Sequence, residues 1–297
     1  MPAATEAASE RFQGLDQWNT TGILEALWAG QSRAVAACLP ALPAIERAVE
    51  DAAARLGSSG RLIYVGAGSS GLIAALDALE LASTFDWPDE RLAIVLAGGL
   101  DFSRGLDSGT EDDPEAARTR MRGLDCTAAD VVIGVSASGT SRFTVAALEE
   151  ARQAGAGTMA VACNAGSALL AAALHPVLIE TGAEVIGGST RLGAGTAQKL
   201  VLNLFSTALM VRLGAVFDNL MVNVRPENEK LRQRCVAMVA RIAGCGPETA
   251  ADAIARTGSV KLAVLALAGV DGERAGAALG NAGGNLRKAL GTCPKPE

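Results

Sequence analysis

The chain has 297 residues, of which 49% are hydrophobic but only 3% aromatic, and it carries 34 glycines and a formal net charge of −6. This composition excludes a disordered or fibrous chain and fits helices packed over a sheet with small side chains at the contacts. The negative charge argues against nucleic acid as the main partner.

No apolar stretch approaches the length of a membrane span. One of the longest, residues 261–270, is about half of the roughly 20 residues that a span requires. The N-terminal stretch carries acidic residues early, unlike a signal peptide. We therefore expect a cytoplasmic protein with no membrane partner. The cysteines form no CxxC pair, so neither a zinc site nor a disulfide framework is expected from Cys38, Cys126, Cys163, Cys235, Cys245 and Cys293.

The chain begins with a helical pattern and then alternates between strands and helices. Apolar residues spaced by three and four predict helices over residues 22–56, broken near Pro40 and Pro43. Short apolar runs follow at residues 61–68, 91–99, 130–137, 157–166 and 175–182, with helices expected at 70–82, 114–124 and 142–154. Such alternation predicts a doubly wound α/β fold around a parallel sheet, with its ligand crevice at the carboxyl ends of the strands.

The rest of the chain is expected to be helical. Longer helices are predicted over residues 194–212 and 227–243, followed by three short helices separated by glycine-containing turns. The break near residues 244–247 predicts a main domain of residues 1–244 and a small helical module of residues 245–297. A bundle of about 45 residues is marginal alone, so we expect it to pack on something else.

Three turns rich in glycine and hydroxyl groups each follow a strand-like run, at residues 66–71, 136–141 and 188–191. Each offers backbone N–H groups and hydroxyls where a helix should begin, which makes a neutral cradle for a phosphate. The candidate ligands are Gly68, Ser69, Ser70, Ser136, Ser138, Gly139, Thr140, Ser141, Ser189, Thr190 and Arg191.

Other interpretations of these turns stay open. The first also matches the G-x-G-x-x-G spacing of dinucleotide sites, but the second strand ends in glycines, without the acidic residue that would hold a ribose. Ser141 could simply cap a helix. Arg191 could pair with a sugar-acid carboxylate or with a neighbouring glutamate. The single histidine, His175, is expected to be structural, since no nucleophile motif accompanies it.

Two acidic positions are candidates for proton transfer. Glu80 lies about three turns into the helix after the first turn, with Asp77 near the same face. Glu111 precedes a helix, and its pattern alone favours an ordinary acidic first turn with Asp113 as the cap before Pro114. Two carboxyl groups from different elements could also supply a general acid and base, which spacing in sequence does not decide.

Taken together, these residues resemble the N-acetylmuramic acid 6-phosphate etherases of the sugar isomerase (SIS) domain superfamily. The resemblance runs almost end to end, and its most specific part is GSTR…AGTAQKLVLN…NLM, residues 188–221. It implies a cofactor-free lyase that acts on a 6-phosphosugar, in which water enters and N-acetylglucosamine 6-phosphate and D-lactate leave. Glu80 matches the family's proton-donor glutamate and Glu111 its second catalytic glutamate. The resemblance also implies a homodimer and a C-terminal module of three helices, similar to ubiquitin-associated domains.

The chain departs from the family pattern close to the three turns. Leu72 replaces an arginine, Arg142 follows a turn that has lost an arginine and a proline, and Gly193 stands where a lysine is usual. These changes leave the exact phosphosugar open. Two other functions remain as alternatives, an SIS aldose–ketose isomerase and a phosphosugar-binding regulator without catalysis.

Overall fold

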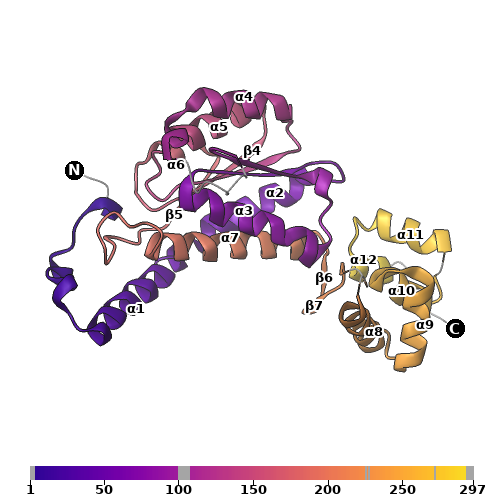
Figure 1. Ribbon diagram of the computed structural model, residues 1–297. Helices are drawn as coiled ribbons and strands as arrows, with labels where there is room; N and C mark the ends of the chain where they lie inside the picture. The colour runs from indigo at the N-terminus through magenta and orange to yellow at the C-terminus, as the bar shows by residue number, and fades with distance from the viewer. Residues whose placement is uncertain (1–3, 100–107, 225, 227, 271, 292–297) are drawn as a thin grey trace. The chain divides into compact units, whose positions relative to one another are not determined.

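The structure, a computed structural model, describes residues 4–99, 108–224, 226, 228–270 and 272–291 (Figure 1). The chain forms two compact units. The first consists of residues 1–79 and 89–206, and the second of residues 80–88 and 207–297. The sequence-based domain boundary at residue 244 stays a prediction.

A parallel five-stranded sheet lies at the centre of the first unit. Its strands are β1 (Leu62–Gly66), β2 (Leu92–Leu96), β3 (Val131–Val135), β4 (Gly157–Ala162) and β5 (His175–Leu178). They lie in the order β2-β1-β3-β4-β5, and every neighbouring pair is parallel. All five predicted strands are confirmed, and so is the doubly wound α/β fold.

Helices precede the sheet and connect its strands. They are α1 (Thr20–Ala36), α2 (Leu42–Leu56), α3 (Gly68–Phe85), α4 (Pro114–Leu124), α5 (Arg142–Gln153), α6 (Ala168–Ala172) and α7 (Gly193–Arg212). Local sequence signals determine where α4 begins. The Asp113 carboxylate caps this helix by accepting a hydrogen bond from Ala116 N at 3.0 Å, and Pro114 is the first helical residue. The predicted break between α1 and α2 is confirmed as well.

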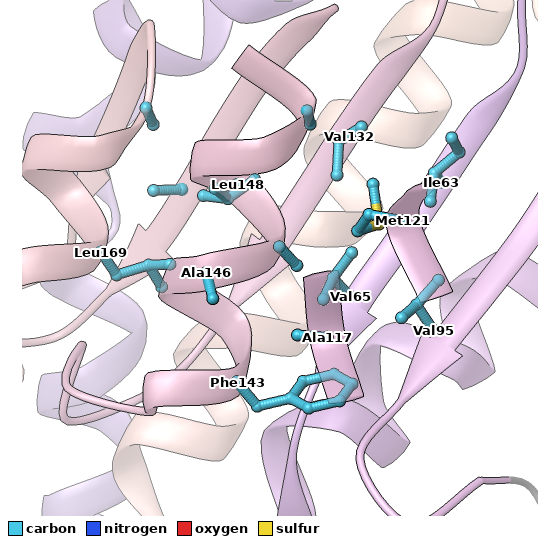
Figure 2. Close-up of a cluster of buried hydrophobic side chains, with 14 of the residues drawn as sticks. Ile63, Val65, Val95, Ala117, Met121, Val132, Phe143, Ala146, Leu148 and Leu169 are labelled. Carbon is cyan, nitrogen blue, oxygen red and sulfur yellow. The ribbon is translucent and has the colours of Figure 1, made fainter. Parts of the chain in front are cut away.

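The helices cover both faces of the sheet, with α4, α5 and α6 on one side and α2, α3 and α7 on the other (Figure 1). Figure 2 shows the core of the first side, where Met121 of α4 and Phe143 and Leu148 of α5 pack with Ile63 and Val65 of β1. Gly134 of β3 lies under α5, since a Cβ there would come 2.8 Å from Leu148 Cδ1. Small residues at these contacts let the helices lie close to the strands, as the composition suggests.

The second unit has its own hydrophobic core. A hairpin of β6 (Val216–Phe217) and β7 (Leu220–Met221) is followed by α8 (Glu229–Ala243), α9 (Pro247–Thr257), α10 (Val260–Leu267), α11 (Gly272–Asn281) and α12 (Leu286–Gly291). Among the described residues, four short helices follow Gly244, so the prediction of three was wrong. Gly283 and Gly284, both with positive φ, end α11 and separate it from α12. Glu227, the predicted start of α8, lies outside the described residues.

No helix in the described part of the chain combines the length and apolarity needed to cross a bilayer. The five cysteines within that part are free thiols, while Cys293 lies outside it.

Candidate functional site

The strand order places the first two hydroxyl-rich turns at the carboxyl ends of neighbouring strands. Strands β1 and β3 are neighbours, with Gly66 opposite Val135 at their carboxyl ends. The chain leaves β1 for α3 on one face and leaves β3 for α5 on the other (Figure 1). In doubly wound sheets, ligands bind at the edge where neighbouring strands send their helices to opposite faces.

The first turn is tightly closed by glycines. A Cβ on Gly66 would lie 2.6 Å from Gly71 Cα, and Gly68 begins α3 with a φ of 54°. Ser69 is exposed, but the Ser70 hydroxyl donates to Gln198 Oε1 at 3.1 Å and so joins this turn to α7. Gly68 and Ser69 therefore line the surface of the turn, whereas Ser70 is already engaged within the protein.

The second turn is organised by hydrogen bonds among its own hydroxyls. Ser136 Oγ accepts from Gly139 N at 3.1 Å, and Ser138 Oγ accepts from Thr140 Oγ1 at 2.9 Å and from Thr140 N at 3.2 Å. Gly139 has a φ of 72°, and a Cβ there would lie 2.3 Å from Ser167 Oγ. The backbone N–H groups of Arg142 and Phe143, in the first turn of α5, have no acceptor within the helix. The structure thus gathers hydroxyls and amide donors here, as a phosphate cradle requires.

Two residues that the sequence interpretation missed hold this turn in place. Asn164 follows β4, and its Nδ2 donates to Ala137 O at 3.1 Å and to Thr5 Oγ1 at 2.9 Å. Thr5 is fully buried, and its carbonyl accepts from Gly188 N at 3.3 Å. The N-terminal segment therefore connects the second turn to the third. A polar residue near the end of the apolar run 157–166 was the available signal for Asn164.

The third turn differs from its prediction. Residues 184–188 form no strand, so Ser189, Thr190 and Arg191 do not follow a strand end as expected. Buried Glu184 occupies the start of α7 instead, where its carboxylate accepts from Gly193 N at 2.9 Å and from Ala194 N at 2.8 Å. This carboxylate fills the position that an anion would take at a helix N-terminus. The three side chains remain predicted ligands, but the amide cradle beneath them is already used.

Glu111 lies beside the second turn. It belongs to a short 3-10 helix, Ser108–Asp112, and its side chain hydrogen-bonds to Ser141. Ser141 caps α5 as predicted, because its Oγ accepts from Thr144 N at 3.4 Å and from Thr144 Oγ1 at 3.0 Å. With both of these bonds accepted, the Ser141 O–H is left to donate to the Glu111 carboxylate.

The surroundings of Glu111 change its acidity. Burial raises the pKa of Glu111, the negative charge of Asp112 raises it further, and the hydrogen bond from Ser141 offsets part of the increase. A carboxyl with a raised pKa can exchange protons closer to neutral pH than an ordinary glutamate. The structure therefore places a carboxyl of raised pKa beside the hydroxyl-rich second turn.

Asp77 and Glu80 have different surroundings, although both lie on α3. Asp77 is only 2% exposed, and it accepts from Tyr64 Oη at 3.0 Å, Asn203 Nδ2 at 2.9 Å and Ser206 Oγ at 3.2 Å. Burial raises the pKa of Asp77, and these hydrogen bonds offset part of the increase. Glu80, three residues further along the same helix, is exposed and belongs to the second unit. Asp77 joins β1, α3 and α7 and is a structural group.

His175 lies at the opposite edge of the sheet from the turns. It begins β5, and its Nε2 is 3.0 Å from Asp51 Oδ2, which also accepts from Arg55 Nε at 2.7 Å. This placement fits the structural role expected for it. Within the described residues, His, Cys, Asp and Glu side chains form no group of three or more that could hold a metal.

Comparison with known proteins identifies the family. Residues 33–163 match the SIS domain. The chain is 44% identical to the N-acetylmuramic acid 6-phosphate etherase of Streptomyces coelicolor, over 96% of this chain and 93% of that one. It is 42% identical to the protein of the same name from Deinococcus radiodurans, over 98% and 96% of the two chains. The chain belongs to the N-acetylmuramic acid 6-phosphate etherase family.

A solved structure supports the fold of this etherase-family chain. A candidate phosphosugar isomerase involved in capsule formation, from Bacteroides fragilis, superposes with a TM-score of 0.53 and 20% sequence identity. The match covers 68% of this chain and 95% of the other. At 20% identity, this match supports the SIS fold and nothing about function.

The structure shows where the three departures from the etherase pattern, Leu72, Arg142 and Gly193, lie. A Cβ at Gly193 would lie 3.0 Å from Glu184 Oε2, so a lysine there would crowd the carboxylate that caps α7. Arg142 is exposed at the first residue of α5, and Leu72 is half-buried in α3. Glycine at position 193 and the Glu184 cap are therefore parts of one local arrangement.

Proposed function

We propose that this protein is a cofactor-independent carbon–oxygen lyase that cleaves the D-lactyl ether of N-acetylmuramic acid 6-phosphate, giving N-acetylglucosamine 6-phosphate and D-lactate. Membership of the etherase family supports the reaction. The observation that carries the proposal is the position of Glu111, a carboxyl of raised pKa, beside Ser141 in the hydroxyl-rich turn.

The second turn is the proposed main phosphate cradle. Hydroxyls of Ser136, Ser138 and Thr140 and the first amides of α5 offer neutral donors, which hold a phosphate dianion without a cation. Gly68 and Ser69 of the first turn add donors at the end of the neighbouring strand. Ser189, Thr190 and Arg191 are proposed to contact the sugar or its lactyl carboxylate.

The proposed chemistry is an elimination followed by addition of water. In the ring-opened sugar, a base removes the proton on C2, which is acidic because C2 lies next to the C1 aldehyde. The C2–H electron pair forms a C2–C3 double bond, the C3–O bond breaks, and an acid protonates the departing lactate oxygen. Water then adds its oxygen to C3 and a proton to C2. Two carboxyl groups can perform all of these proton transfers.

We assign the base to Glu111 and the acid to Glu80. Burial and the negative charge of Asp112 raise the pKa of Glu111, which makes its ionised form a stronger proton acceptor than an ordinary carboxylate. Glu80 matches the proton-donor glutamate of the family, and its side chain is accessible.

The direct test is to incubate the purified protein with N-acetylmuramic acid 6-phosphate and to measure D-lactate. We expect release of lactate and N-acetylglucosamine 6-phosphate in equal amounts. Binding of the phosphosugar without lactate at high enzyme concentration would favour a regulator and overturn the proposal. Conversion of an aldose 6-phosphate to a ketose, again without lactate, would favour an isomerase.

Substitution of Asp112 by asparagine should move the pH dependence of the reaction. The negative charge of Asp112 helps to raise the pKa of Glu111, so its removal lowers that pKa. A base acts in its ionised form, and therefore the rise of kcat/KM with pH should begin at lower pH in the variant. A pH profile of lactate release measures this. If the rise of kcat/KM with pH were unchanged in the variant, or moved to higher pH, the result would argue against Glu111 as the base.

We further propose that the protein is a homodimer that uses α1 at its interface. One stripe of this helix exposes Leu24 at 60% and Trp28 at 76%, together with Val35. Replacing Trp28 by glutamate should convert the dimer to a monomer in light scattering coupled to gel filtration. Leu174→Glu, which changes an exposed leucine outside the α1 stripe, is the control and should stay dimeric. A wild-type monomer would refute this proposal.

We also propose a cytoplasmic location, with a role in the reuse of peptidoglycan amino sugars. The free thiols, of which Cys38, Cys163 and Cys235 are buried, suit a reducing compartment. Cell fractionation would test the location, and recovery of the protein outside the cytoplasm would contradict it.

A further inference from the structure

The end of helix α3 belongs to the same compact unit as the C-terminal helices. Residues Glu80–Pro88 group with residues 207–297, while the start of the helix groups with the sheet. Glu80 is the first residue of this segment and lies about one and a half turns before Phe85, the last residue of α3. The second unit can therefore act on Glu80 through the end of its helix.

Asn223 forms the clearest contact between this helix end and the rest of the second unit. Its Nδ2 donates to the carbonyl of Phe85 at 3.0 Å. That carbonyl is one of the last in the helix and has no partner within it. Asn223 itself is held firmly, because its neighbours Val222 and Val224 are both buried in the hydrophobic core of the C-terminal helices.

Lys261 of α10 forms a second, electrostatic link. It is only 6% exposed, and its Nζ donates to Gly284 O at 2.6 Å, just before α12. Burial lowers the pKa of Lys261 to about 8, and the negative charge of Asp86 partly offsets this. Asp86, whose charge acts on this buried ammonium group, follows directly after α3.

Asp86 determines where the helix stops. It has a φ of 54°, and its N–H donates to Ala82 O at 3.0 Å, so the chain turns out of the helix at this residue. Trp87, buried next to it, donates from its N–H to Leu81 O at 3.4 Å. The last turn of α3 is thus held by its own ending and by the hydrogen bond from Asn223, while the charge of Lys261 acts on Asp86.

We propose that Asn223 and Lys261 are positioning residues for Glu80, so that the helical C-terminal part of the chain aims the catalytic acid. This inference rests on the proposed function, in which Glu80 donates a proton to the leaving lactate. The substrate's phosphate is bound elsewhere in that scheme. Loss of the links should therefore lower kcat and leave KM nearly unchanged.

The experiment compares isosteric variants with matched controls. Asn223→Asp replaces the donor by an acceptor facing the Phe85 carbonyl, and exposed Asn281→Asp is its control. Lys261→Met removes the buried charge, and exposed Lys288→Met is its control. Asp86→Asn keeps a side chain that tolerates left-handed backbone, so it provides a mild variant even if the others fold poorly. Thermal unfolding reports whether each variant folds.

We expect kcat for lactate release to fall about tenfold or more in Asn223→Asp and Lys261→Met, with KM within about twofold of wild type. Asp86→Asn should lower kcat by a smaller factor, and both controls should match wild type. In a Glu80→Gln background, Asn223→Asp should have no further effect, because it acts through Glu80. Folded variants with wild-type kcat would overturn the inference. So would an equal fall in kcat when Asn223→Asp is made in the wild-type and in the Glu80→Gln background. An inactive wild type would instead refute the proposed function.

Discussion

Replacing Glu111 by glutamine should lower kcat for lactate release at least about a hundredfold, the range expected when a general base is lost. Glutamine keeps the size of the side chain and can still accept a hydrogen bond from Ser141, so the second turn should keep its shape. KM should stay within about threefold of wild type, because the donors to the phosphate are unchanged. Steady-state kinetics and titration with N-acetylglucosamine 6-phosphate measure the two effects separately.

The matched control is Glu115→Gln, four residues further along the chain. Glu115 is exposed on α4 and pairs at 2.6 Å with Arg118, a surface ion pair of little energetic value. It should leave kcat and KM unchanged. If Glu111→Gln retained more than about a tenth of wild-type kcat, Glu111 would be a structural partner of Ser141 and not the base.

The sheet and the second turn could be predicted from the sequence because their signals are local. Five apolar runs identified five strands, and hydroxyls after the β3 run identified the cap of α5 and the residues around it. The acidic residues 111–113 before Pro114 predicted an acidic first helical turn, and Asp113 does cap α4. Nothing in the spacing could show that Glu111 lies beside Ser141, since that contact joins the 3-10 helix before α4 to the N-cap of α5.

The contacts that the sequence did not predict join residues from different elements of the chain. Thr5 and Asn164 are separated by 159 residues, and Tyr64 meets Asp77 through the packing of β1 against α3. The sequence pattern predicts a strand through Glu184, but the Glu184 carboxylate accepts two amide hydrogen bonds at the start of α7, and its segment is irregular. Only the tertiary structure brings these partners together.

The substitution Glu80→Gln should lower kcat for lactate release by about a hundredfold or more and leave phosphosugar binding intact. Glu80 is exposed, so the change should alter the free energy of unfolding by no more than about 0.5 kcal/mol. Glu248→Gln, an exposed glutamate on α9 in the same unit, is the control and should behave as wild type. Loss of binding together with loss of turnover would contradict a role restricted to proton donation.

Exchange of the C2 proton in D2O separates the two glutamates. A base removes this proton before lactate leaves, whereas the acid acts only on the departing oxygen. Glu80→Gln should therefore still exchange the C2 proton of N-acetylmuramic acid 6-phosphate, seen as loss of its NMR signal, while releasing no lactate. Glu111→Gln should do neither. If Glu111→Gln exchanged the C2 proton and Glu80→Gln did not, Glu80 would be the base and Glu111 the acid. Asn223 and Lys261 would then position the base and not the acid.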